Sequence, residues 1–154
     1  MCQAEQVNDD DALALTALLL AASRALIDGI STGTAARGFD DIRPAHGFAF
    51  TLLSRGGTTV TELAEHLGVT RQAAGQLTDE LVLKGYVERR PHPVDARARL
   101  IVLTARGWAC TRAADEAARD TVRPWAAALG DERLHALRLG LERIAPGGPL
   151  RPVW

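Results

Sequence analysis

The sequence has 154 residues, 47% of them hydrophobic and 24% charged, which fits a globular domain with its own core and excludes a disordered or fibrous chain. Aromatic residues make up only 5%, while Ala, Leu, Arg and Gly are abundant, so a mainly helical fold with little strand is expected. The formal net charge of −1 excludes a uniformly basic protein, so any surface for an acidic partner must be local.

The first expected helix begins at residue 9, after a loose N-terminal tail. Three aspartates at 9–11 suit the positive end of a helix dipole. Residues 12–30 are then apolar on nearly every side, so a partner subunit is expected to cover them. The apolar run 12–22 follows acids rather than a basic segment and is too short to span a bilayer, which predicts a soluble cytoplasmic protein. Three glycines in 29–38 are expected to end the helix.

Residues 43–67 predict two further helices. Pro44 suits the first turn of a helix that runs to about residue 54. Thr59 and Glu62 have the spacing of a capping box, which opens a short helix over 60–67. The inner face of this short helix is expected to consist of Leu63, Ala64 and Leu67.

A glycine turn connects the short helix to the next one. Gly68 permits a left-handed backbone, Val69 fills the corner, and Thr70 caps a helix that reaches about residue 84. The buried face of this helix is expected to consist of Ala73, Leu77 and Leu81. Taken alone, the pattern also fits an ordinary helical hairpin.

Two short strands and two helices are expected to follow. The strands are predicted at 86–90 and 99–103, joined by a rigid and charged loop. Thr104 caps a long helix that reaches at least residue 122 and that Pro124 is expected to kink or break. After a stop at Gly130, the last helix presents the apolar residues Leu134, Leu137, Leu141 and Ile144. The predicted units are 1–38, a tail and dimerisation helix, 39–106, a DNA-binding domain, and 107–154, dimerisation helices and a tail.

The hairpin changes the interpretation of the helix pair, because a wing with several arginines is typical of a winged helix-turn-helix. Residues 66–106 carry seven basic and four acidic residues (+3), whereas residues 1–41 carry two basic and seven acidic ones (−5). A local basic surface is therefore possible on a neutral protein.

In a winged helix-turn-helix, the N-terminal residues of the second helix lie against base edges in the major groove. Arg can pair with guanine and Gln with adenine, while a glycine lets the backbone approach closely. The candidate DNA-binding residues of this helix are Thr70, Arg71, Gln72, Gly75 and Gln76. The alternative for each of them is a solvated helix face.

The loop between the strands has its own candidates. Asp95 lies two residues before Arg97, so its carboxylate can hold the guanidinium extended for insertion into a narrow minor groove. A plain surface salt bridge is the alternative. The candidate phosphate contacts are Arg89, Arg90, His92 and Arg99.

Four segments carry a family resemblance: TELAEHLGVT, QAAGQL, KGYVER and DAR followed by LTARG. On these segments, residues 44–107 resemble the MarR family of bacterial winged-helix transcriptional regulators. The resemblance implies a homodimer formed by terminal helices at about 9–30 and 108–145. It also implies a palindromic operator, with half-sites about 34–36 Å apart, and repression relieved by a small-molecule ligand.

The resemblance places such a ligand between the dimerisation helices and the winged domain. The candidate ligand-binding residues are Phe39, Arg43, His46, Phe50 and Trp108, for each of which core or surface is the alternative. Some members of the family sense oxidants through an N-terminal cysteine and tyrosines. Here Cys2 lies in the tail, Tyr86 belongs to the wing, and Cys110 is expected to be a small buried residue.

An enzyme is the remaining alternative. Gly29 and Gly33 enclose a GISTG segment that matches the nucleophile elbow of hydrolases, but that motif needs a preceding strand and a parallel sheet. No metal-binding or nucleotide-binding motif is present, so neither catalysis nor a cofactor is expected. The sequence therefore predicts a mainly α winged helix-turn-helix regulator. The alternatives are a winged-helix protein that acts through protein partners and a redox sensor that uses a cysteine.

Overall fold

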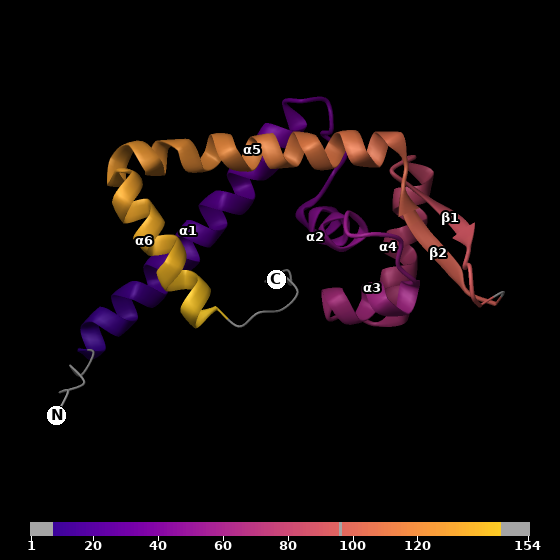
Figure 1. The fold of residues 1–154 in the computed structure, drawn as a ribbon, viewed down its shortest axis with the longest axis horizontal. Helices are drawn as coiled ribbons and strands as arrows, with labels where there is room; N and C mark the ends of the chain where they lie inside the picture. Colours follow the sequence, from indigo (N-terminus) through magenta and orange to yellow (C-terminus); the bar gives the residue numbers. More distant parts are fainter. Residues whose placement is uncertain (1–7, 96, 146–154) are drawn as a thin grey trace.

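The computed structural model describes residues 8–95 and 97–145, which form six helices and a two-stranded antiparallel sheet. In Figure 1, the long helices α1 (Asp9–Ala35) and α5 (Ala105–Leu129) cross, and α6 (Asp131–Ile144) turns back from the end of α5. The remaining elements form a compact unit below the beginning of α5. The expected mainly helical fold with a small wing is confirmed.

Helix α1 is longer than predicted. The helix ends within the glycine-rich segment 29–38, as expected, but α1 continues through Gly29 and Gly33 and ends only at Ala35. A Cβ atom on Gly29 would lie 2.6 Å from Thr121 Cγ2, and one on Gly33 would lie 2.7 Å from the Cβ of Ala117. The two glycines therefore allow α1 and α5 to pack closely.

The helices α2 (Pro44–Leu53), α3 (Val60–Leu67) and α4 (Arg71–Leu83) agree closely with the predicted ranges. The capping box of α3 is confirmed: the backbone N–H of Thr59 donates to Glu62 Oε2 at 2.7 Å, and the N–H of Glu62 donates to Thr59 Oγ1 at 3.3 Å. Gly68 has a left-handed backbone, with φ 67°, and ends the helix.

The buried face of α4 differs from the prediction. Ala73 is exposed and Leu77 is only half-buried, whereas Ala74, Thr78 and Leu81 are buried. The polar Thr78 fits in the core because its hydroxyl donates to the carbonyl of Ala74 at 2.7 Å. The solvent-exposed face of α4 is therefore shifted by about one residue from the predicted face.

The wing consists of β1 (Val87–Pro91) and β2 (Arg99–Leu103), paired antiparallel with Val87 opposite Leu103. Thr58, which precedes α3, adds a short third pairing that the sequence analysis missed. Its N–H donates to the carbonyl of Ile101 at 3.0 Å, and the N–H of Ile101 donates back at 2.7 Å. The wing root is thereby attached to the helix-turn-helix.

Helix α5 continues through Pro124 to Leu129, so Pro124 does not break the helix, and the alternative that it kinks the helix stays a prediction. The φ angle of proline is compatible with a helix, and the loss is one backbone hydrogen bond to the residue four positions earlier. That residue is Asp120, which is exposed, so water can satisfy its carbonyl.

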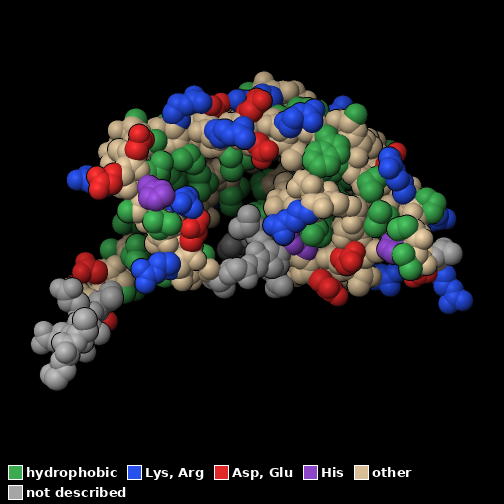
Figure 2. Space-filling model, viewed as in Figure 1, with side chains coloured by type: hydrophobic (Ala, Val, Ile, Leu, Met, Phe, Trp, Pro, Cys, Tyr) green, Lys and Arg blue, Asp and Glu red, His purple; other side chains and the backbone are tan. Residues whose placement is uncertain are grey.

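The hydrophobic core lies in the unit formed by α2, α3, α4, the wing root and the start of α5. Its largest fully buried residues include Leu53, Leu63, Leu81 and Ile101. In contrast, α1 buries only Thr34, and α6 buries none of its residues. Leu13, Leu15, Leu18 and Leu20 of α1 are more than half exposed. Hydrophobic side chains also line the hollow beneath α5 in Figure 2.

By length and composition alone, α1 is also long and apolar enough to cross a membrane, with a mean hydropathy of 1.7 over 18 residues. The sequence analysis expected a segment too short to span a bilayer because it counted only the apolar run at residues 12–22. The same exposed apolar surface is what a partner subunit would cover.

Candidate nucleic-acid interface

The N-terminal half of α4 presents the candidate base-reading residues to solvent. Thr70 caps the helix, since its hydroxyl accepts the N–H of Ala73 at 3.2 Å. Gln72 and Gln76 are exposed opposite the buried Ala74, Thr78 and Leu81, and Arg71 is exposed in the first turn, at the edge of that surface. Gly75 is half-buried on the same side as Arg71 and Gln72. The structure thus brings the five α4 candidates together on one surface.

The carboxylate of Glu80 attaches α4 to α2, which the sequence analysis missed. Lys84 Nζ donates to Glu80 Oε1 at 2.8 Å, and Arg43 pairs with Glu80 Oε2. His46 Nε2 lies 3.4 Å from the same oxygen. The hydrogen bond from Lys84 is the largest of the interactions that lower the pKa of Glu80 to about 2. Glu80 is therefore ionised at neutral pH and holds α4 to the start of α2.

His46, a candidate ligand contact, is fully buried. Its Nδ1 accepts the backbone N–H of Arg43 at 3.1 Å, which closes the N-terminus of α2. Burial is the main cause that lowers its pKa, so the ring is neutral near pH 7. The structure thus gives His46 the role of a satisfied core residue that also faces Glu80.

The loop of the wing is held by its own polar side chains. His92 Nδ1 accepts the backbone N–H groups of Val94, at 3.3 Å, and Asp95, at 3.0 Å. Asp95 Oδ1 accepts the backbone N–H of Arg97 at 2.9 Å. The predicted contact between the Asp95 carboxylate and the Arg97 guanidinium is replaced by this turn, because a short side chain reaches the backbone two residues ahead more readily.

The arginines of the interface fall into two groups. Arg89 donates to Asp79 Oδ1 at 2.6 Å, which ties β1 to α4, and Arg90 pairs with Glu88 at 2.5 Å. Within residues 8–95 and 97–145, no acidic partner is found for Arg71, Arg97 or Arg99, all of which are exposed. Their charge is therefore the most available to an acidic ligand.

Tyr86 is the centre of a polar junction that sequence reasoning did not identify. It is fully buried, and its hydroxyl donates to Asp41 Oδ1 at 2.6 Å. Arg106 donates to the same hydroxyl at 3.0 Å and lies 4.6 Å from the ring centre. Burial, followed by the contact with Asp41, raises the pKa of Tyr86 to about 12. The one signal for it in the sequence is that Tyr86 is the single tyrosine of the chain.

The five candidate ligand residues do not share one surface. The ring centre of Phe39 lies 6.2 Å from that of Tyr86, and the ring centre of Phe50 lies 5.8 Å from it. Phe50 is buried. Arg43 is largely exposed, and Trp108 is 41% exposed on α5. Their proposed role as a ligand site therefore stays a prediction.

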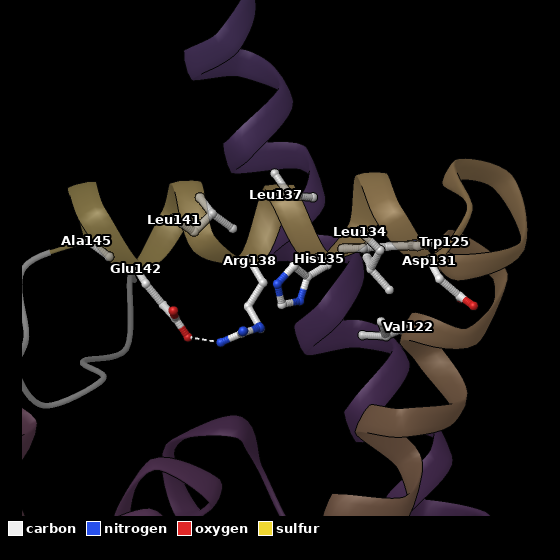
Figure 3. A pocket seen from close by; sticks show the side chains of 10 residues that line it. All are labelled: Val122, Trp125, Asp131, Leu134, His135, Leu137, Arg138, Leu141, Glu142 and Ala145. Atoms are coloured by element: carbon white, nitrogen blue, oxygen red, sulfur yellow. Dashed lines mark hydrogen bonds and ion pairs between the residues drawn. The ribbon is translucent and has the colours of Figure 1, made fainter.

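A groove of about 640 Å³ lies elsewhere, between the end of α5 and α6 (Figure 3). Its apolar lining includes Val122, Trp125, Leu134 and Leu141. Arg138 and Glu142 pair on its rim, in the same view.

Two alternative readings, a nucleophile elbow at GISTG and a redox-active Cys110, can be compared with the structure. The GISTG segment lies inside helix α1, so the strand that a nucleophile elbow needs is absent there. Cys110 is 1% exposed, and burial raises the pKa of its thiol to about 11, which makes it unreactive at neutral pH. Cys2 lies outside the described residues.

Comparisons with known proteins agree with this geometry. A family model described as MarR family matches residues 40–98. The HTH-type transcriptional regulator PetP of Rhodobacter capsulatus is 35% identical over 105 residues, which are 68% of this chain and 63% of PetP. The chain therefore spans slightly less than two thirds of the length of that curated relative.

Solved structures resemble the fold over most of the chain. RV1404 from Mycobacterium tuberculosis is 27% identical with a TM-score of 0.72, covering 89% of this chain and 95% of that one. Apo wild-type MarR from E. coli is 25% identical with a TM-score of 0.70, covering 86% and 97%. A cysteine-to-serine mutant of E. coli MarR, solved in complex with operator DNA, is 24% identical with a TM-score of 0.70, covering 89% and 97%.

Proposed function

The chain belongs to the MarR family, and from this premise we propose that it is a sequence-specific DNA-binding transcriptional regulator. The proposal rests on one observation: α4 and the wing are adjacent, and both present exposed polar or basic side chains. Helix α4 presents Arg71, Gln72 and Gln76, and the adjacent wing presents Arg97 and Arg99 without acidic partners among the described residues. The name of PetP supports this reading, as does the fold shared with a MarR mutant that was solved on operator DNA.

In the proposed complex, α4 enters the major groove and the wing enters the adjacent minor groove. The ion pair between Arg89 and Asp79 links the two elements. Hydrogen bonds from α4 read base edges, whereas Arg97 enters the narrow groove, where the negative potential is highest. Arg90, Arg99 and the Nε2 of His92 are then positioned for phosphates.

We propose that the active form is a homodimer that covers the exposed leucines of α1 and the groove between α5 and α6. Exposed apolar patches of this extent are typical of interaction surfaces. A two-fold dimer requires a palindromic operator with half-sites about 34–36 Å apart. With the leucines covered in this way, α1 needs no bilayer, and we propose a cytoplasmic protein whose winged domain is residues 39–106.

Whether the protein represses or activates transcription is inferred from the family alone. We propose repression that is relieved when a small molecule binds between the dimerisation helices and the winged domain. The Tyr86 junction ties the segment before α2 to the first turn of α5, the helix that continues out of the winged domain. A ligand that disturbs it would change the position of α4.

Selection from random DNA, repeated at several salt concentrations, tests the function directly. A palindromic site and a linear decrease of log affinity with log salt are expected. Arg97→Ala should abolish detectable operator binding while the dimer persists. The matched control is Arg112→Ala, which removes an arginine from α5, away from the wing. Equal binding by both variants would show that the wing does not enter the groove.

A further inference from the structure

The exposed face of α4 carries a restricted set of groups that could recognise bases. Gln72 and Gln76 each present an amide, and the described residues offer neither amide a hydrogen-bond partner. Arg71 supplies the one guanidinium on this face. Gly75 lies four residues after Arg71 and three after Gln72, on the same side of the helix, so the middle of this face carries no side chain.

This set favours adenine and thymine. A glutamine amide can donate to adenine N7 and accept from its N6 amino group, whereas a small apolar residue contacts the methyl group of thymine. Gln72 and Gln76 lie about 6 Å apart along the helix axis. This distance is on the order of two base-pair steps, so the two amides can address different base pairs.

The groups that would read cytosine are absent or occupied on this face. Asp79 is the next exposed residue along it, and a carboxylate can accept from the amino group of cytosine. However, Asp79 already accepts the short hydrogen bond from Arg89 at 2.6 Å. Glu80 is directed to Lys84, Arg43 and His46 on another side of the helix.

Gly75 indicates how closely the DNA approaches. Glycine is less favourable than alanine inside a helix, so a buried neighbour usually explains it. At Gly33, an added Cβ would collide with Ala117, but at Gly75 it would meet no atom of the chain within 4 Å. The packing of the chain therefore does not explain this glycine, and the space beside it is open to a group outside the chain.

We propose that the operator half-site consists mainly of A·T pairs, read by Gln72 and Gln76, with one thymine methyl against the bare backbone at Gly75 and one guanine bound by Arg71. This inference rests on the proposed function, because it specifies the DNA that the same surface recognises.

The test uses the full-length dimer and the duplex obtained by selection. Replacing the contacted adenines one at a time with 7-deazaadenine removes only the N7 acceptor, and should weaken binding about 5-fold or more at two positions. Gln72→Ala should be insensitive to one of these replacements and Gln76→Ala to the other. Such paired insensitivity shows direct contact, because a merely structural role would leave both replacements harmful.

Gly75→Ala provides the complementary test. The added methyl group should weaken binding to the selected duplex about 5-fold or more, and uracil in place of one thymine should restore it by removing the opposing methyl. Gly47→Ala is the matched control, since Gly47 lies inside α2 and also has no atom within 4 Å of an added Cβ. It should leave DNA binding unchanged.

The outcomes separate this inference from the function on which it depends. If no sequence is enriched at any salt concentration, the proposed regulator function fails. If a site is enriched but its half-sites are rich in G·C pairs, the function stands and this inference is overturned. It is equally overturned if both glutamine variants respond to 7-deazaadenine as the wild type does.

Discussion

The reading domain, formed by α2 to α4 and the wing, differs sharply from the helices α1 and α6. In the reading domain, Leu63 and Leu81 are fully buried, and the polar Thr78 and His46 have partners within the chain. In α1 and α6, most leucines face outward, and Leu18 is 66% exposed. The first region is complete within one chain, whereas the second presents a surface that a second chain would complete.

This contrast separates two sources of stability. The core of the reading domain contributes the same free energy of unfolding at any protein concentration. In the proposed dimer, the exposed apolar surface of α1 and α6 contributes only when chains associate, so its contribution rises with concentration. The comparison can therefore be tested by substitutions of the same residue type in the two regions.

The largest effect on folding is expected for Leu63→Ala. Removal of this fully buried side chain should lower the free energy of unfolding by about 2–5 kcal/mol, because a cavity is left in the core. Urea denaturation at two protein concentrations should give the same loss. Leu83→Ala is the control: Leu83 is 89% exposed, and its removal should change stability by less than about 0.5 kcal/mol.

Leu18→Asp should act on assembly instead of folding. A charge on the outward face of α1 is expected to convert the dimer to a monomer and to weaken operator binding at least about 10-fold, since one half-site is then lost. Light scattering coupled to size exclusion measures the mass, and circular dichroism should show an unchanged helix content. A variant that keeps the dimer mass would contradict the assignment of α1 to the dimer surface.

Tyr86→Phe tests the junction between the two regions. The ring packing is kept, but the hydrogen bond to Asp41 is lost, which should cost about 1–3 kcal/mol of unfolding free energy. The folded-state pKa of Tyr86 is raised from 10 to about 12, so its contribution is complete below pH 10 and is lost as the pH rises towards 12.

The measurement is the melting temperature of both proteins from about pH 8 to about pH 11.5, a range that brackets the ordinary pKa of tyrosine. The difference between wild type and variant should shrink above pH 10. A difference that stays constant over this range would show that the hydroxyl does not stabilise the folded state through its proton.

The smallest effect is expected for Asp79→Asn. The substitution releases Arg89 and removes a negative charge beside the DNA, so affinity should rise by less than about 5-fold and the salt dependence should steepen by about one charge. Filter binding at several salt concentrations measures both quantities. Glu88→Asn is a comparison in the wing, since it releases Arg90 in the same way. Weaker binding by Asp79→Asn would show that the ion pair is needed to position the wing.

Much of the reading domain was predictable because its signals are short in sequence. The capping box of Thr59 and Glu62, the turn at Gly68 and the cap at Thr70 each join residues at most a few positions apart. The buried face of α4 was displaced by one position, because the pattern could not show that Thr78 satisfies its hydroxyl within the helix. The side-chain contact from Asp95 to Arg97 was wrong for a similar reason, since the backbone N–H competes for the carboxylate.

By itself, the sequence determined the winged helix-turn-helix, the surface of α4 that carries Arg71 and Gln72, and the apolar character of α1. These depend on periodicity, caps and turns, whose energies are local. Only the tertiary structure decided that α1 continues through Gly33, that Asp79 neutralises Arg89, and that Glu80 holds α4 to α2. Each of these results from a contact between separate elements, up to 84 positions apart between Gly33 and Ala117, which no local pattern encodes.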